Sequence, residues 1–187
     1  MKDNVKIGLM IGGGVAITAI AAILIFGRNA AQKVLSEAKR YVGIREIYND
    51  QGWHDKAFEQ KMRKIGWQVG WQWCACFVQM VMCQVAKGEA LKWWQKHLSP
   101  SAPACYNNIK AAGKNPYAEI IAKPESGCIV VYSHHIEFCE SVSGDNITSI
   151  SGNSQISTGV QGVKRAVRNI RNPFAPILGY IRIKKIS

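Results

Sequence analysis

The hydrophobic pattern of the chain changes its period past the midpoint, and this change limits the folds that the chain can adopt. Up to about residue 113, apolar residues recur at helical spacing or form runs long enough for a buried helix. Beyond residue 127, short segments rich in β-branched residues are separated by Gly, Asp or Asn. Helices followed by consecutive short strands predict an α+β fold, in which N-terminal helices pack on an antiparallel sheet.

The individual elements follow from these two periods. The dense apolar run 74–86 predicts a buried helix, and the tetrapeptide SGDN at 143–146 predicts a tight hairpin turn. The other predicted helices are 29–43, 56–65, 91–98 and 103–113. The predicted strands are 128–133, 135–142, 146–152, 162–167 and 177–183.

A long apolar run precedes these elements. Residues 7–26 read IGLMIGGGVAITAIAAILIF and contain no charge. At about 1.5 Å per residue, a helix of this length spans roughly the 30 Å of a bilayer core. A cleaved signal peptide is the alternative, but its apolar region is shorter, about 7–15 residues, and ends at small residues. The sequence therefore predicts a tail at 1–6, a transmembrane anchor at 7–27 and one domain at 28–187.

The charges bear on the partners and on the orientation. The net charge is +12, which favours nucleic acid, acidic lipid or the acidic polymers of a cell wall. No recognition motif supports nucleic acid. Lys or Arg stands at 28, 33, 39 and 40 after the apolar run but only at 2 and 6 before it, which favours a cytoplasmic domain. The six cysteines show no secreted disulfide framework and favour the same side.

The segment WCACFV carries the first candidate for chemistry. Cys74 opens the predicted helix, so the helix dipole and free N–H groups are expected to lower the thiol pKa and to favour the nucleophilic thiolate. Of the four histidines, only His134 and His135 fall at the start of a predicted strand, where either imidazole can activate the thiol. Asn153, in the ISGNS segment that ends the next strand, is placed to orient that imidazole, although Asn also commonly caps a turn.

A zinc site is the alternative for the cysteines. Cys74, Cys76 and Cys83 lack the paired Cys-x-x-Cys spacing of structural zinc. Cys76 is instead expected to pack in the core. We therefore expect neither a metal nor another cofactor.

Four segments in order resemble the CHAP family of cysteine, histidine-dependent amidohydrolases and peptidases, which belongs to the NlpC-type superfamily of papain-like fold. They are WCACFV, PESGCIVVYS, HIEFCESVSGDNITSISGNS and ILGYIRI. The resemblance covers residues from about 40 to 183. It implies a papain-like domain whose nucleophile stands at a helix start.

Position by position, the resemblance implies that Cys74 is the nucleophile, His135 the base and Asn153 the orienting residue, with His134 as the alternative base. Three positions depart from the family pattern and indicate a divergent member. Ser151 stands where many members have Glu, Cys128 where an Asp usually follows the Gly, and Glu137 where the His-Val-Gly pattern has Gly.

The oxyanion hole and the substrate cleft are less defined by the sequence. The N–H of Cys74 is one expected donor. Gln68 lies six residues before the cysteine, the interval of the oxyanion glutamine in papain-like enzymes, and Gln72 competes with it. Trp71 and Trp73 are candidates for the cleft, with packing as the alternative, and Ser151 is a further candidate for the cleft. Further cations that can form a solvated face or attract an anionic polymer are Lys164, Arg165, Arg168 and Arg171.

The resemblance implies hydrolysis of amide bonds in peptidoglycan, either within the peptide or between muramic acid and L-alanine. The leading hypothesis is a membrane-anchored cysteine endopeptidase or N-acetylmuramoyl-L-alanine amidase of phage entry or lysis, in a virion membrane or a bacterial inner membrane. Peptidoglycan, the membrane at residues 7–26 and virion proteins are its expected partners. The alternative is a non-catalytic virion membrane protein that binds wall or lipid through a degenerate hydrolase domain.

Overall fold

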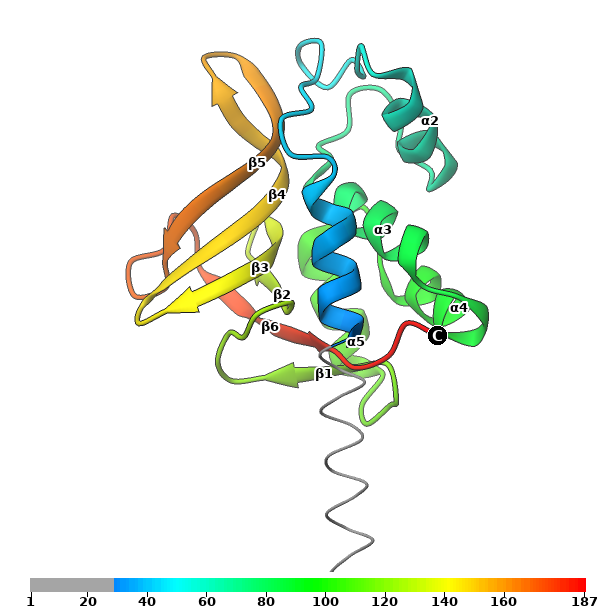
Figure 1. The fold of residues 1–187 in the computed structure, drawn as a ribbon, viewed down its shortest axis with the longest axis vertical. Coiled ribbons are helices and arrows are strands. Elements are labelled where there is room, and N and C mark those ends of the chain that lie inside the picture. The colour runs from blue at the N-terminus through cyan, green and yellow to red at the C-terminus, as the bar shows by residue number, and fades with distance from the viewer. Residues whose placement is uncertain (1–28) are drawn as a thin grey trace, which may run out of the picture.

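The computed structural model describes residues 29–187, so the predicted tail and anchor lie outside the described range. Among the described residues, no helix is both long and apolar enough to cross a membrane. The helices all precede the strands in the chain (Figure 1). Residues 29–39 are helical, and the later helices are α2 (Lys56–Lys64), α3 (Cys74–Val85), α4 (Gly88–His97) and α5 (Ala102–Ala111).

The second half forms one six-stranded sheet in the order β1-β6-β2-β3-β4-β5, with every neighbouring pair antiparallel. The predicted α+β class is therefore confirmed. The strands are β1 (Ala118–Ile121), β2 (Ile129–Tyr132), β3 (Ile136–Ser143), β4 (Asn146–Ser157), β5 (Val160–Asn169) and β6 (Ile177–Ile183).

The hairpin between β3 and β4 confirms the turn predicted at 143–146. Ser143 pairs with Asn146, and Gly144 adopts a φ of 56°, which glycine reaches without steric cost. This short turn sets the register of β3 against β4. It thereby helps to position His135, which directly precedes the other end of β3.

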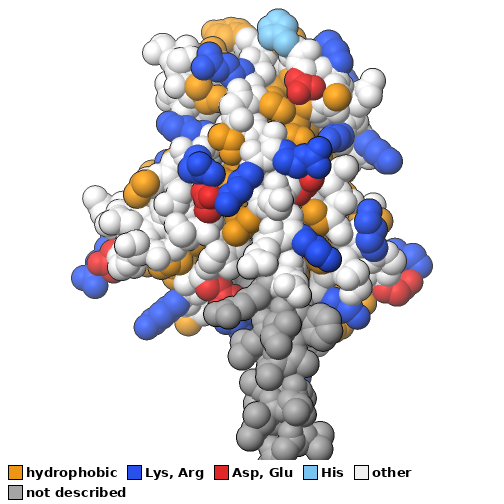
Figure 2. Space-filling view, viewed as in Figure 1, with side chains coloured by type: hydrophobic (Ala, Val, Ile, Leu, Met, Phe, Trp, Pro, Cys, Tyr) orange, Lys and Arg blue, Asp and Glu red, His pale blue; other side chains and the backbone are white. Residues whose placement is uncertain are grey.

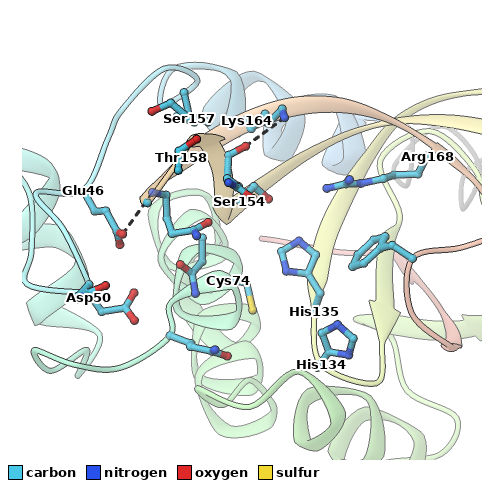
Figure 3. Close-up of a pocket in the computed structure, with 18 residues that line it drawn as sticks. Glu46, Asp50, Cys74, His134, His135, Ser154, Ser157, Thr158, Lys164 and Arg168 are labelled. Carbon is cyan, nitrogen blue, oxygen red and sulfur yellow. Dashed lines mark hydrogen bonds between the residues drawn. The ribbon is translucent and has the colours of Figure 1, made fainter.

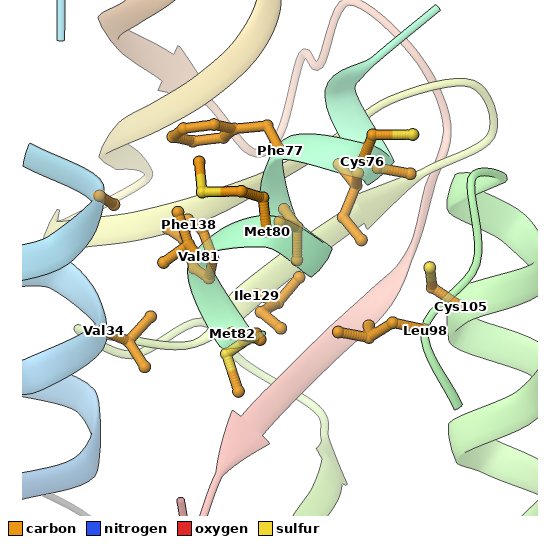
Figure 4. Close-up of a cluster of buried hydrophobic side chains, with 14 of the residues drawn as sticks. Val34, Cys76, Phe77, Met80, Val81, Met82, Leu98, Cys105, Ile129 and Phe138 are labelled. Carbon is orange, nitrogen blue, oxygen red and sulfur yellow. The ribbon is translucent and has the colours of Figure 1, made fainter. Parts of the chain in front are cut away.

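The main core lies between the helices and one face of the sheet, with α3 at its centre (Figure 4). Phe77, Met80 and Val81 of α3 are fully buried together with Ile129 and Phe138 of the sheet. Burial of apolar surface on this scale is the main force that holds a helix against a sheet. Cys76 is also fully buried in this cluster, which confirms the packing role predicted for it.

A second, smaller cluster covers part of the opposite face of the sheet. It contains Cys128, which directly precedes β2, together with Val130 and Tyr132 of β2 and Cys139 of β3. Because side chains alternate along a strand, β2 is buried on both faces, which explains its unbroken apolar sequence. All six cysteines are free.

One glycine marks the closest approach of α3 to the sheet. A Cβ atom added to Gly152 of β4 would stand 2.6 Å from Phe77 Cβ and 2.6 Å from Trp73 Cζ3. Since real Cβ atoms do not approach so closely, any side chain at this position would force α3 away from β4.

Gly152→Ala is therefore expected to lower the free energy of unfolding by about 1–3 kcal/mol through this overpacking. Chemical denaturation measures the change. Gly113→Ala is the control, because its Cβ meets nothing within 4 Å and only the backbone cost of its φ of 61° remains, about 1 kcal/mol. A Gly152→Ala protein as stable as the wild type would contradict the described packing of α3 on β4.

Candidate active site

Cys74 is the first residue of α3. The preceding residue, Trp73, provides no side-chain cap, so N–H groups of the first turn lack a capping partner and the positive end of the helix dipole lies at Cys74. The thiol is nevertheless 6% exposed. Burial raises the pKa of Cys74, and the opposing N–H groups of Ala75 and Ile136 do not overcome it. The lowered thiol pKa expected from the helix start is thus not found.

His135 directly precedes β3, on the strand edge that meets the start of α3. The N–H of Tyr132 donates to the carbonyl oxygen of His135 at 2.8 Å and closes the turn between β2 and β3. Its imidazole is 8% exposed. Burial, and then the charges of Arg168 and His134, lower the pKa of His135 to about 4, so the imidazole is neutral at pH 7.

These two groups line one cleft with a volume of about 770 Å³ (Figure 3). The start of α3 supplies Cys74, and the residues before β3 supply His134 and His135. The hairpin between β4 and β5, residues 153–161, forms much of one wall, and Glu46 and Asp50 belong to another. The N–H of Ile136 lies beside the Cys74 sulfur. Because Ile136 follows His135 in the chain, the start of β3 lies next to the thiol.

The cleft also brings in Asn153, so the three predicted catalytic residues lie around one cavity. Asn153 sits where the pairing of β4 with β5 shifts register, and its φ of 51° is left-handed, a conformation that Asn tolerates better than most residues. Within residues 29–187, no hydrogen bond joins its side chain to His135 or joins Cys74 to His135.

The predicted oxyanion and cleft residues are distributed differently. Gln68 and Trp71 are not among the described residues that line the cleft, whereas Gln72, the competing glutamine, does line it. Trp73 is fully buried in the core and donates from Nε1 to Glu46 Oε2 at 3.1 Å. Core packing and this hydrogen bond keep Trp73 away from the cleft.

Ser151 also differs from the expectation, because it is fully buried instead of lying in the cleft wall. Its hydroxyl is 2.7 Å from the hydroxyl of Ser154, which does line the cleft. Ser151 therefore supports a wall residue from behind.

Sequence reasoning missed an acidic pair in the cleft. Glu46 is buried, and burial together with the charge of Glu46 raises the pKa of Asp50 to about 6. Asn49 and Asp50 both adopt left-handed φ angles, of 47° and 57°. The turn residues of this segment were visible in the sequence, but nothing in them indicated that the loop folds back beside α3.

The zinc alternative finds no support in the arrangement of the cysteines. Within residues 29–187, no three His, Cys, Asp or Glu side chains are grouped so that they could hold a metal ion. Cys76 lies in the core and Cys83 is half-buried further along α3.

Comparisons with known proteins relate the chain to others by fold. No family model and no curated protein matches the sequence. The crystal structure of Ly7917 matches over 82% of this chain and 62% of that chain, with a TM-score of 0.50 and 14% sequence identity. A structure of Ly7917 with the hydrolyzing product of MDP matches with a TM-score of 0.49 at the same identity and coverage. This chain therefore shares the fold of Ly7917 over somewhat less than two thirds of that protein's length.

The depressed pKa of His135 predicts a pH dependence of stability. Between pH 6.5 and about 4, the unfolded chain binds a proton at His135 that the folded chain does not, so the free energy of unfolding falls as the pH is lowered through this window. The contribution is at most roughly 3 kcal/mol. Chemical denaturation of wild type and His135→Gln at pH 7 and pH 4 measures it, since the variant lacks this proton. Equal losses in the two proteins would contradict a neutral, buried imidazole.

Proposed function

We propose that the chain is a cysteine hydrolase that cuts amide bonds in peptidoglycan. In this proposal it is a divergent, papain-like member of the CHAP family, attached to a membrane through residues 7–27. The observation that supports it most is the meeting of the Cys74 thiol, at a helix start, with the His135 imidazole around one open cleft. The order of helices before an antiparallel sheet supports the papain-like layout.

The protonation of the two groups indicates how such a reaction starts. Burial keeps the thiol protonated and the imidazole neutral at pH 7. Cys74 therefore passes its proton to His135 as the sulfur attacks the carbonyl carbon, instead of resting as a thiolate–imidazolium pair. The N–H of Cys74 and the side chain of Gln72 are the donors placed to stabilise the oxyanion.

The remaining steps return the site to its resting state. The imidazolium of His135 gives its proton to the leaving amine nitrogen, the C–N bond breaks, and the acyl group stays on Cys74 as a thioester. His135 then takes a proton from a water molecule that attacks the thioester. The acid product leaves, and the thiol regains its proton.

The surface charge supports attraction to an anionic wall polymer over a distance. Lys and Arg are spread over the face shown in Figure 2, with few Asp and Glu among them, and the whole chain carries +12. Three of the four cations at Lys164, Arg165, Arg168 and Arg171 form ion pairs with acidic side chains. These ion pairs are Arg165–Glu140, Arg168–Glu137 and Arg171–Asp145, at 2.7, 3.4 and 2.8 Å.

The burial of Cys74 and His135 also supports the non-catalytic alternative. Cys74 and His135 are each less than a tenth exposed, and the thiol pKa is raised rather than lowered. A degenerate domain retained for binding to wall or lipid would keep such a cleft without turnover. The two functions are separated by testing cutting and binding in the same protein.

Full-length protein in detergent is expected to release fragments from purified cell walls, and Cys74→Ala to release them at least about 10³-fold more slowly because it has no nucleophile. Mass spectrometry of the new ends distinguishes an endopeptidase from an amidase. Cys83→Ala is the matched control, a half-buried thiol on the same helix.

Both variants are expected to sediment with walls as the wild type does. Cutting by Cys74→Ala at the wild-type rate would refute the proposed mechanism. Wall binding by all three proteins without any cutting would favour the non-catalytic alternative.

A further inference from the structure

The environment of His135 contains a carboxylate with no role in the reaction described above. Glu137 lies two residues further along β3 and is fully buried. Its Oε1 accepts a hydrogen bond from the Tyr132 hydroxyl at 2.8 Å, and its Oε2 lies 3.4 Å from Arg168 Nε. The same Oε2 lies 3.8 Å from Nε2 of His135.

The His135 nitrogen that faces this carboxylate is itself unsatisfied. Nε2 is buried and has no hydrogen-bond partner among the described residues. A buried polar atom without a partner is costly, and few occur in a folded protein. The 3.8 Å separation exceeds a hydrogen bond, but hydrogen bonds of catalytic groups are often long before substrate binds and tighten afterwards.

We propose that Glu137 is the positioning residue of the His135 imidazole. Its carboxylate accepts a hydrogen bond from Nε2–H, which selects the tautomer that leaves Nδ1 unprotonated and able to accept the Cys74 proton. The carboxylate also stabilises the imidazolium formed after that transfer. This inference rests on the proposed function for its catalytic meaning, while the tautomer itself is a property of the resting protein.

Glu137 suits this role better than Asn153. The Glu137 carboxylate is close to the imidazole, because its Oε2 lies 3.8 Å from Nε2 of His135. The Tyr132 hydroxyl from β2, which pairs with β3, and the Arg168 guanidinium from β5, two strands away, hold its carboxylate. Asn153 lines the cleft but makes no described hydrogen bond to the imidazole.

The departures from the CHAP pattern fit the same assignment. Phe138 pairs with Ile150 across β3 and β4, and Glu137 and Ser151 are their neighbours at this point of the ladder. The resemblance implies Gly at the first of these positions and Glu at the second, whereas this chain has Glu and Ser. In this chain the carboxylate therefore stands on β3, at Glu137, instead of on β4, at position 151.

The charged and titratable groups around the pair define what must be controlled. Arg168 from β5 lies beside both Glu137 and His135, Tyr132 from β2 donates to the carboxylate, and His134 neighbours the imidazole. Burial raises the pKa of Glu137 above its ordinary value, and the charge of Arg168 opposes this rise without cancelling it. Arg168 also stacks over the Phe174 ring at 4.7 Å, which fixes the guanidinium independently of Glu137.

The test uses the full-length protein and two substitutions of similar volume. Glu137→Met removes both the acceptor and the charge, whereas Glu137→Gln removes the charge but keeps an acceptor oxygen. Nitrogen-15 NMR of the His135 ring reads the tautomer, and wall hydrolysis gives kcat and KM. We expect wild type to hold the Nε2–H tautomer. Glu137→Met is expected to give a mixture of tautomers and a kcat at least about 10-fold lower at unchanged KM, with a smaller loss for Glu137→Gln.

Two further variants control for indirect effects. Glu140→Gln removes a carboxylate of the same strand that pairs with Lys39 and Arg165, and it should change neither the tautomer nor kcat. Asn153→Ala tests the competing orienting residue and is expected to leave the tautomer unchanged.

A wild-type tautomer and kcat in Glu137→Met would overturn the inference, as would a mixture of tautomers in Asn153→Ala alone. A wild type that cuts no wall would refute the proposed function instead, and the His135 tautomer would then decide the present inference by itself. A Glu137→Met protein that does not fold leaves the decision to Glu137→Gln, whose unchanged kcat and unchanged His135 titration would overturn it.

Discussion

Helix α3 packs so closely on β4 that Gly152 leaves no room for a side chain, and the position of the Cys74 thiol follows from this contact. Phe77 of α3 and the preceding Trp73 pack against β4 at Gly152. This packing holds the N-terminal turn of α3 next to the residues where β3 begins. His135 stands at that edge, fixed by the short hairpin between β3 and β4. Cys74 and His135, 61 positions apart in the sequence, are thus brought together by the packing of the elements that carry them.

Burial then decides the electrostatics of the site. It opposes charge on the thiol and on the imidazole alike, so the resting pair is neutral. A neutral pair depends on which ring nitrogen carries the proton, because only an unprotonated nitrogen can accept the thiol proton. The buried carboxylate of Glu137 makes that choice in our account, and its ion pair with Arg168 offsets part of the cost of burying it.

Sequence patterns predicted the helices and strands whose formation depends on residues close together in the chain. The dense apolar run located the start of α3 at Cys74, and ILGYIRI located β6 at Ile177–Ile183. Strand β1 was missed because its four residues form a strand only by pairing with β6, far along the chain. Strand β4 runs past the predicted 146–152 because backbone pairing with β5 extends it through polar residues.

The candidate site was also predicted only in part from the sequence. Motifs identified Cys74, His135 and Asn153, which share the cleft, but the burial of Trp73 and Ser151 depends on tertiary packing that no motif encodes.

The most direct measurement is the alkylation rate of Cys74 at pH 7 in wild type and His135→Ala, read by mass spectrometry with Cys83 as internal reference. Our account predicts at least about a 10-fold slower reaction of Cys74 in the variant and an unchanged rate at Cys83. An equal rate at Cys74 in both proteins would contradict the claim that the thiol and the imidazole act together.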